Sequence, residues 1–281
     1  MPEMPEVQAH AERLTEDFGG IALERFVPLA FTALKTYSPQ PDVAYGQPLR
    51  SVGRRGKYLL LQFEPATFVV HLMQGGRLKL DPKQAAKPKG GQARWRFADG
   101  RALMLTEAGT EHRAGVWVLG GPADDRLERE PLDHLGPEAL DVDRARLGEL
   151  LAAHPMRLHG WLRDQRIIAG LGRRLANEIC HRAKISPFAS TGKLDDDAVD
   201  RLHDAITACI EDSLAYERTR DDMSSSKDRP GSVHHREGEA CPVCGDTIRA
   251  VEYRSYTVNY CPTCQTGGKV LADNTTSKFL K

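Results

Sequence analysis

The feature that most restricts the fold of this chain is a set of four cysteines near its C-terminal end. Two residues separate Cys241 from Cys244, sixteen residues follow, and two residues again separate Cys261 from Cys264. Each Cys-x-x-Cys pair turns the chain so that two sulfurs can meet one tetrahedral ion. This spacing is typical of a four-thiolate zinc site. The sequence therefore predicts one structural Zn²⁺ bound by Cys241, Cys244, Cys261 and Cys264.

The stretch between the two pairs predicts a β-ribbon, with one strand in Ile248–Tyr253 and the other in Tyr256–Tyr260. Four thiolates leave no open coordination position, so the metal has a structural role. A redox role is disfavoured because no thioredoxin-like pattern lies beside the pairs. Cys180 and Cys209 lie in stretches of helical periodicity, where buried free thiols are expected. This cysteine usage indicates a reducing, cytoplasmic compartment.

The N-terminal residues Pro2 and Glu3 are candidates for chemistry. If Met1 is removed, the chain begins with a secondary amine next to a carboxylate. An α-amino group has a pKa of roughly 7.7–8.0, against about 10.4 for lysine, so much more of it is the free, nucleophilic amine at neutral pH. The alternative is ordinary helix capping, because Pro and Glu are common where a helix begins. An amphipathic helix is expected over Glu6–Phe18.

Composition and charge narrow the class of protein. With 281 residues, 40% of them hydrophobic, two or three domains are expected. No run is long enough to span a bilayer and no signal peptide precedes the first helix, so no membrane partner is expected. The formal net charge is zero, but Arg50–Arg101 holds 12 Lys/Arg against 3 Asp/Glu, and His154–Lys193 holds 8 against 2. Two basic regions are compatible with phosphate binding or with simple solvated faces.

Periodicity changes along the chain from strands to helices. Short strands with turn signals between them, including a basic turn at Arg54–Lys57, predict an antiparallel sandwich or barrel in the first part. After an acidic linker, apolar residues recur at helical spacing, and Thr219–Glu237 is expected to be a flexible loop. The expected strands are Tyr58–Phe63, Phe68–Leu72, Ala93–Phe97, Ala102–Thr106 and Val116–Leu119, and the expected helices are Asp143–Ala153, Met156–Leu162, Arg173–Ala183 and Leu194–Glu217.

Several of these stretches, in this order, resemble the formamidopyrimidine-DNA glycosylase and endonuclease VIII family. The resemblance covers about 265 residues, and each motif is modest by itself, whereas the ordered set is specific. The motifs are Met1-Pro2-Glu3-Met4-Pro5-Glu6-Val7, Arg54-Arg55-Gly56-Lys57-Tyr58-Leu59, His71-Leu72-Met73-Gln74-Gly75-Gly76-Arg77-Leu78, Leu162–Gly172 followed by Ala176-Asn177-Glu178, Arg236–Cys241, and Cys261–Gln265.

The resemblance implies an α+β fold: an N-terminal helix-flanked antiparallel β-sandwich, a helical helix–two-turns–helix domain and a C-terminal zinc ribbon. The expected divisions are 1–122 for the catalytic domain, 123–141 for the linker, 142–235 for the helical DNA-binding domain, 236–268 for the zinc finger and 269–281 for a basic tail. The implied activity is base-excision repair of double-stranded DNA that contains damaged bases or abasic sites. A monomer is expected.

The resemblance also implies roles for individual residues. Pro2 is the nucleophile that forms an imine at C1′, Glu3 is the acid/base group, and Lys57 assists at the sugar-phosphate. The target nucleotide must leave the helix before C1′ can be reached. Elimination at the imine is expected to cut the strand on the 3′ side of the lesion and then on the 5′ side. The expected DNA-binding residues are Gln74, Arg113, His159, Arg173 and Arg254.

The sequence departs from the family pattern at positions that are expected to contact DNA. Gln74 stands at the usual methionine, beside Met73, and Ala114 replaces the usual phenylalanine wedge next to Arg113. Since an apolar wedge stabilises unstacked base steps, weak discrimination between opposite bases is expected. Further departures are Arg173 at the usual asparagine, His159 at the usual lysine, and Tyr256 at the usual ribbon arginine, two residues after Arg254.

These observations predict a bifunctional DNA glycosylase/abasic-site lyase acting on oxidised pyrimidines, formamidopyrimidines and abasic sites in preference to 8-oxoguanine. One alternative is a non-catalytic paralogue that only binds damaged DNA. The joint presence of Pro2, Glu3 and Lys57 disfavours it. A second alternative is a zinc-ribbon regulator that reads DNA sequence, but Arg173–Ala183 presents mostly apolar residues beyond its first turn.

Overall fold

The computed structural model describes residues 1–109, 112–121, 123–224, 228–254 and 256–271. Contacts between Cα atoms divide the chain into two compact units. The first unit comprises Met1–His134 together with Asp221–Met223, and the second comprises Leu135–Arg220 and the chain from Ser224 onward. No helix within the described residues is both long enough and apolar enough to cross a membrane.

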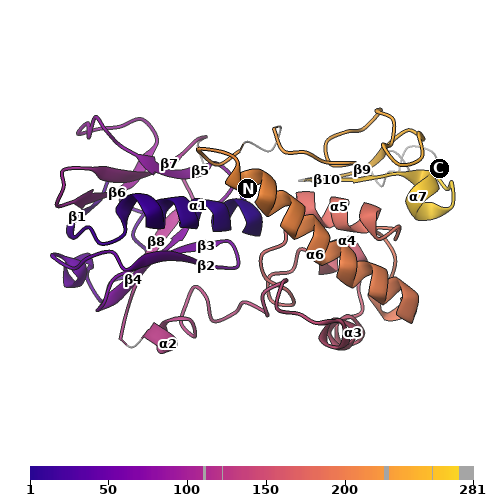
Figure 1. Ribbon diagram of the computed structural model, residues 1–281, viewed down its shortest axis with the longest axis horizontal. Helices are drawn as coiled ribbons and strands as arrows, with labels where there is room; N and C mark the ends of the chain where they lie inside the picture. Colours follow the sequence, from indigo (N-terminus) through magenta and orange to yellow (C-terminus); the bar gives the residue numbers. More distant parts are fainter. Residues whose placement is uncertain (110–111, 122, 225–227, 255, 272–281) are drawn as a thin grey trace. The chain divides into compact units, whose positions relative to one another are not determined.

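The first unit begins with helix α1 (Met4–Phe18), two residues earlier than the sequence predicts. Strands then follow one another, and Figure 1 shows α1 lying alongside them in indigo. Val7, Ala11 and Leu14 of α1 are buried in the core that the strands share. The other elements are β1 (Leu23–Pro28), the 3₁₀ helix η1 (Pro41–Ala44), β2 (Ser51–Arg55), β3 (Tyr58–Gln62), β4 (Ala66–His71), β5 (Gly76–Leu80), β6 (Gly91–Phe97), β7 (Ala102–Glu107), β8 (Gly115–Gly120) and α2 (Ala123–Arg126).

The strands form two four-stranded antiparallel sheets, in the orders β1-β6-β7-β5 and β2-β3-β4-β8. This confirms the predicted antiparallel sandwich. The predicted basic turn is shorter than expected, because Arg54 and Arg55 pair with Leu59 and Tyr58 as part of β2. Strand β5 is not among the strands predicted from the sequence, since it is short and lies between the turn signals Gly75-Gly76 and Asp81-Pro82.

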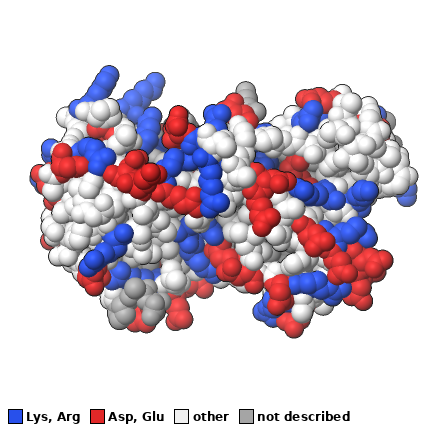
Figure 2. Space-filling model, viewed as in Figure 1, with Lys and Arg blue, Asp and Glu red and all other residues white. Residues whose placement is uncertain are grey.

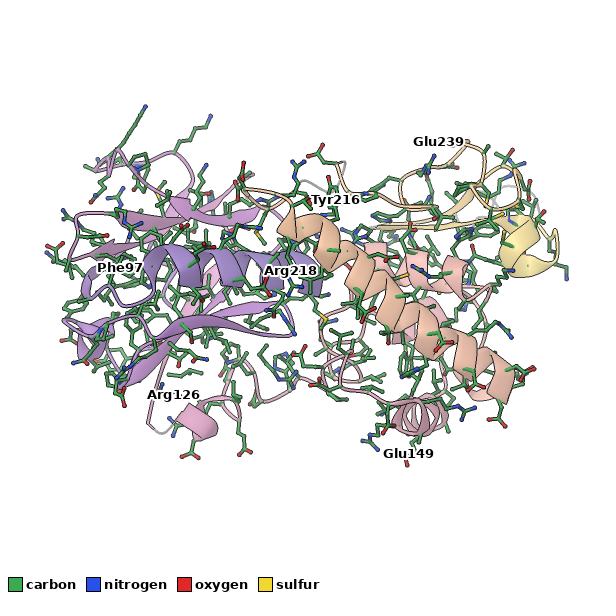
Figure 3. The ribbon with its side chains drawn as sticks, viewed as in Figure 1. Phe97, Arg126, Glu149, Tyr216, Arg218 and Glu239 are labelled. Carbon is green, nitrogen blue, oxygen red and sulfur yellow. The ribbon has the colours of Figure 1, made fainter. Side chains whose placement is uncertain are left out.

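Aromatic rings fill the space between the two sheets. Phe68 of β4 lies with its ring centroid 5.4 Å from Phe26, 5.6 Å from Phe63 and 6.0 Å from Trp95. At one end of the core, Phe97, labelled in Figure 3, packs on Phe18 of α1 at 4.7 Å. Such rings dominate the apolar area of a core, so this unit has its own source of stability.

Helix α2 is held by its last residue, Arg126, also labelled in Figure 3. The buried guanidinium donates to the backbone oxygens of Gly121, Phe63 and Glu64, at 2.8, 3.3 and 2.8 Å. It also donates to the Thr67 hydroxyl at 3.1 Å. These bonds satisfy a cation that would be costly to bury alone.

The second unit is mainly helical and ends in a ribbon. The four predicted helices are present, although the one predicted over Met156–Leu162 is only the single turn α4. The expected ribbon strands pair antiparallel, with Val258 opposite Val251. The elements are α3 (Arg144–Ala153), α4 (Leu158–Trp161), α5 (Arg173–Arg182), the 3₁₀ helix η2 (Thr191–Lys193), α6 (Asp196–Arg218), β9 (Arg249–Tyr253), β10 (Tyr256–Tyr260) and α7 (Pro262–Thr266).

Between α6 and β9 the described residues form no helix or strand, as expected for a loop, but parts of this segment are buried. Met223 belongs to the hydrophobic core of the first unit. Ser224 is 1% exposed and donates to the Glu217 carboxylate, while Val233 is fully buried beside the ribbon. Residues 225–227 and, in the predicted basic tail, 272–281 lie outside the described residues.

Candidate functional site

The N-terminal end of α1 carries two of the predicted catalytic residues. Pro2 is buried and Glu3 is 3% exposed. The backbone N–H of Glu3 donates to Glu6 Oε2 at 2.6 Å, so the Glu6 carboxylate fixes the first turn. Carboxylates are favoured here because the helix dipole is positive at this end. The observed bond is helix capping, and it fixes the backbone of Glu3 directly after Pro2.

The predicted assisting residue, Lys57, lies in the tight turn between β2 and β3. Gly56 has φ 54°, a left-handed conformation that favours glycine. Arg54 links this turn to α1, because it donates to Gly56 O at 3.0 Å and to Gln8 Oε1 at 3.2 Å. Lys57 is 6% exposed. The same arginine thus holds the Lys57 turn and the first turns of the helix that begins beside Pro2.

His71, at the end of β4, faces the same turn. Its ring lies 4.5 Å from the ring of Tyr58. Burial, and then the nearby Lys57 ammonium, lower the pKa of His71 to about 4. The imidazole is therefore neutral at physiological pH and adds no charge beside Lys57. Its Nδ1 accepts the backbone N–H of Met73 at 3.3 Å, in a turn where Met73 has φ 52°.

The predicted DNA-binding residues Gln74 and Arg113 lie on two neighbouring loops of the first unit. Gln74 is exposed at the tip of the turn between β4 and β5. The backbone N–H of Ala108 donates to Gly75 O at 3.2 Å, which joins this turn to the loop after β7. Arg113 is exposed just before β8. Ala114 is fully buried and its N–H donates to the Glu107 carboxylate at 2.7 Å, so its methyl group is no surface wedge.

Arg173 is the first residue of α5, after the turn predicted to hold a phosphate. Gly170 has φ 100°, which a side chain would make costly. The Gln165 side chain fixes the turn by accepting from Gly170 N at 3.1 Å and donating to Leu171 O at 2.8 Å. The N-terminal amides of α5 and the half-buried Arg173 form the kind of helix terminus that binds phosphate.

His159, by contrast, is not arranged as a surface cation. It is 3% exposed on α4, and its ring stacks on Tyr256 at 6.1 Å and 14°. Tyr253 stacks on the same tyrosine at 4.6 Å and 9°, and the Arg163 guanidinium lies 4.2 Å from its ring centroid. A cation over a ring at this distance is attracted by the ring quadrupole.

These contacts put an arginine beside Tyr256, where the sequence suggests that arginine is lost. Arg254, the ribbon residue predicted to contact DNA, is exposed in the turn after β9. Arg157, at the start of α4, donates to the Tyr253 hydroxyl at 3.4 Å. The end of the ribbon therefore combines two stacked tyrosines with several cations.

The four predicted metal ligands come together at the other end of the ribbon. Cys241 Sγ lies 3.9 Å from Cys264 Sγ, and Cys244 Sγ lies 3.3 Å from Cys261 Sγ. Sulfurs bound to one tetrahedral zinc are about 3.8 Å apart, given Zn–S bonds of about 2.3 Å. The donor set therefore fits a structural zinc ion.

A fifth donor, His181 of α5, also belongs to this cluster. Its Nε2 lies 3.3 Å from Cys241 Sγ. The ligating atoms of His181, Cys241, Cys261 and Cys264 all lie within 4.8 Å of one another. Sequence reasoning missed His181 because it lies 60 residues before Cys241 and in no metal-binding motif.

Helix α5 is also joined to the ribbon through Glu178 and the finger residue Gln265. The Glu178 carboxylate accepts backbone N–H groups from Ser232, Val233 and His234 at 2.6, 3.1 and 2.8 Å. Gln265 Nε2 donates to Ile185 O at 3.0 Å, just beyond the helix. Three backbone donors on one carboxylate make a charge-assisted anchor for the chain that enters the finger.

Charges of both signs are mixed on the face shown in Figure 2, where Lys/Arg and Asp/Glu side chains alternate. This agrees with the formal net charge of zero. Local groups, such as the Lys57 turn of the first unit, are features that could recognise phosphates.

The sequence matches known domains in both units. Residues 1–110 match the formamidopyrimidine-DNA glycosylase N-terminal domain, and residues 135–225 match the formamidopyrimidine-DNA glycosylase H2TH domain. A formamidopyrimidine-DNA glycosylase of Roseiflexus sp. (strain RS-1) is 33% identical over 279 residues, covering 94% of this chain and 100% of that protein. An uncharacterized formamidopyrimidine-DNA glycosylase-like protein of Mycobacterium tuberculosis is 45% identical over 149 residues, covering 52% of this chain and 94% of that protein.

The fold agrees with solved structures. Lactococcus lactis Fpg (MutM), in a complex with DNA containing N7-benzyl-Fapy-dG, matches with a TM-score of 0.84. The identity is 23%, and the match covers 94% of this chain and 100% of that one. The full-length relative, the two matched domains and the common fold lead to one conclusion: the chain belongs to the formamidopyrimidine-DNA glycosylase family, whose members are DNA glycosylases.

Proposed function

We propose that this chain is a base-excision-repair enzyme that removes damaged bases from DNA and then cleaves the strand at the abasic site. The observation that carries the proposal is the start of α1, where Pro2 precedes the capping residue Glu3 in a chain of this family. A proline amine suits both reactions, because its imine lacks an N–H to lose and stays a cationic electron sink.

The reaction begins when the Pro2 nitrogen attacks C1′ of the damaged nucleotide. The bond between C1′ and the base breaks, and the base leaves with a proton. The nitrogen loses its own proton, and its lone pair then forms the imine as the C1′–O4′ bond breaks and O4′ takes up a proton, which opens the sugar ring. Loss of a C2′ proton then drives cleavage of the C3′–O bond, which releases the 3′ side of the strand. A second elimination would release the 5′ phosphate.

Glu3 is the proposed proton donor and acceptor in these steps, since it adjoins the nucleophile and is nearly buried. Lys57 is the proposed assisting cation at the sugar-phosphate. The neutral state of His71 supports this role, because a charged imidazole would add a further positive charge beside Lys57. Such a charge would raise the cost of burying the lysine ammonium.

Five further residues are proposed to contact DNA: Gln74, Arg113, His159, Arg173 and Arg254. Arg173 suits a phosphate contact at the start of α5, and Gln74 and Arg113 suit contact with bases on exposed loops. We propose that His159 acts indirectly, through the ring of Tyr256, because it is 3% exposed. The proposed divisions of the chain are those expected from the sequence, with catalysis in 1–122, DNA binding in 142–235 and the finger in 236–268.

The Cys241, Cys244, Cys261 and Cys264 thiolates are proposed to hold one Zn²⁺ that shapes the ribbon. The metal supplies folding energy to the finger and takes no part in the chemistry at C1′. We further propose a cytoplasmic monomer acting on double-stranded DNA. Oxidised pyrimidines, formamidopyrimidines and abasic sites are the proposed substrates in preference to 8-oxoguanine.

Weak discrimination between opposite bases is part of this proposal, because Ala114 is buried and offers no apolar wedge. Cleavage of the same lesion opposite each of the four bases would measure it. Similar rates are expected, and a strong preference for one opposite base would contradict the proposal.

The central test is borohydride trapping on a duplex with a single abasic site, followed by mass mapping of the adduct. The protein is first checked by mass to start at Pro2, since Met1 would block the amine. A stable adduct on the Pro2 nitrogen is expected. A matched Glu3→Gln variant should bind the same duplex but cleave it far more slowly, because general acid–base catalysis contributes about 10²–10⁴-fold.

Two outcomes would separate the alternatives. Binding of the abasic duplex without any adduct, from protein with a Pro2 start and bound zinc, would favour the non-catalytic paralogue. An adduct on Lys57 in place of Pro2 would keep the lyase activity but overturn the assignment of the nucleophile.

A further inference from the structure

The metal cluster holds one donor more than a tetrahedral ion can bind. Four sulfurs and the Nε2 of His181 converge on one region, although zinc in structural sites takes four ligands. In the four-thiolate state, His181 Nε2–H donates to Cys241 Sγ at 3.3 Å. Hydrogen bonds of this kind orient a ligand and tune its donor strength.

The four sulfurs are not equally protected. Cys244 is exposed, whereas Cys241 and Cys261 are buried and Cys264 is half-buried. Together with His181, these three form the compact group whose donor atoms all lie within 4.8 Å. Ligands of a tetrahedral Cys₃His zinc site are about 3.5–3.8 Å apart, so small shifts would bring this group onto a metal ion.

We propose that His181 is a reserve ligand that replaces Cys244, converting the site from Cys₄ to Cys₃His. The exchange breaks the bond from zinc to Cys244 Sγ and forms one from zinc to His181 Nε2. The ring proton moves from Nε2 to Nδ1 through solvent, so that Nε2 offers a lone pair to the zinc ion, and Cys244 leaves as a thiolate. This inference rests on the proposed zinc ribbon and extends it.

The surroundings of His181 favour such an exchange. His181 lies on the regular helix α5, and Glu178, one turn earlier, holds the chain that enters the finger. Gln265, next to Cys264, is bonded to Ile185 just after the same helix. These two links keep the imidazole within reach of the cluster. A cavity of about 270 Å³ is lined by both His181 and Cys264 and gives these side chains room to move. Another cavity, of about 370 Å³, lies on a β-sheet of the first unit.

The consequence is a finger that survives damage to its exposed cysteine. Thiolates that are exposed are the ones most readily modified. A site that loses Cys244 but gains His181 would keep its ion and hence its fold.

The test is a double-variant comparison in the full-length protein, with zinc itself as the probe. Zinc content and affinity, by competition with a chromophoric chelator, are measured for wild type, Cys244→Ala, His181→Phe and the double variant. Phenylalanine keeps a ring of similar size without nitrogen donors. One zinc per chain is expected in wild type, His181→Phe and Cys244→Ala, and loss of zinc in the double variant.

If His181 were only a hydrogen-bond partner of Cys241, its loss would weaken zinc binding by about 10–100-fold in either background. If His181 is a reserve ligand, His181→Phe should instead weaken zinc binding much more in the Cys244→Ala background than in wild type. Cobalt substitution provides a second readout, because its visible d–d bands move to shorter wavelength when a nitrogen replaces a sulfur. This move is expected in Cys244→Ala and not in wild type.

Cys261→Ala is the matched control, since Cys261 belongs to both ligand sets and its loss should release zinc. Loss of zinc from Cys244→Ala, or equal zinc binding by Cys244→Ala and the double variant, would overturn the reserve-ligand role. Absence of zinc from wild type would instead overturn the proposed zinc ribbon itself.

Discussion

The sandwich of the first unit and the ribbon of the second differ in the buried residues that can offset the entropy cost of folding. The sandwich buries large rings such as Phe68 and Trp95 between two sheets. The hydrophobic cluster at the finger contains four buried residues, two of them cysteines. Val251, Val258 and Tyr260 of the ribbon are also buried. Burial of a large apolar side chain contributes about 1.5–3 kcal/mol, so these few residues offset only part of the entropy of ordering the finger. The proposed zinc ion would supply to the finger the stability that apolar burial supplies to the sandwich.

Removal of zinc is expected to produce the largest difference in stability between the two regions. Structural zinc in finger peptides binds with an apparent free energy of about 10–16 kcal/mol, which is also their folding energy. A strong chelator should therefore unfold residues 236–268 and leave the sandwich folded. Hydrogen exchange read by mass spectrometry would report this, with rapid exchange in β10 and continued protection of β4. Equal loss of protection in both strands would show that the regions do not differ in this way.

A smaller effect is expected from a cavity in the sandwich. Phe68→Ala removes a fully buried ring that contacts three others, which typically costs about 3–5 kcal/mol. The first unit should unfold at a lower urea concentration, while zinc content stays at one ion per chain. Phe31→Ala is the control, because Phe31 is fully exposed and should change stability little. Release of zinc on Phe68→Ala at low urea would mean that the two regions depend on each other.

The smallest of the three effects is a dependence of folding stability on pH, and it is expected in the sandwich unit alone. Burial lowers the pKa of His10 to about 4, although its Nε2 donates to Leu78 O at 2.6 Å. Among the described residues its buried Nδ1 has no hydrogen-bond partner, so protonation would bury an unsatisfied charge. The unfolded chain, with a His pKa near 6.5, binds the proton more readily than the folded chain.

Folding stability is therefore full above pH 6.5 and is lost as the pH falls toward 4, by about 3 kcal/mol from this group. Urea unfolding of wild type and His10→Gln between pH 7 and 4 measures the effect. The variant should show a shallower loss, since glutamine can donate to Leu78 O but does not titrate. Identical slopes would assign the acid sensitivity to other groups, among them His71.

Much of this architecture could be predicted because it rests on local patterns. Short continuous apolar runs predict β3, β4 and β7, and the cysteine spacing predicts the cluster of four sulfurs. The first residue of α1 is predicted less accurately than these strands. The pattern of apolar residues begins at Val7, whereas the helix begins at Met4, where the bond between Glu3 and Glu6 caps it. Backbone capping of this kind leaves only a weak trace in the sequence.

The contacts that could not be predicted join segments far apart in the chain. His181 meets Cys241 across 60 residues, and Arg163 meets Tyr256 only once α4 lies against the ribbon. Reading Tyr256 alone suggests that a cation is lost, but the fold brings Arg163 over its ring. Position-by-position comparison misses such a contact because the cation comes from a different element.

The placement of Met223 limits how this protein can be taken apart. Residues 221–223 belong to the first unit although the chain on both sides belongs to the second. A fragment that ends at His134 would lack a side chain of its own hydrophobic core. The two units therefore cannot be exchanged between relatives by one crossover at the linker. Recombination that keeps the core complete must carry the short return segment along with the sandwich that it completes.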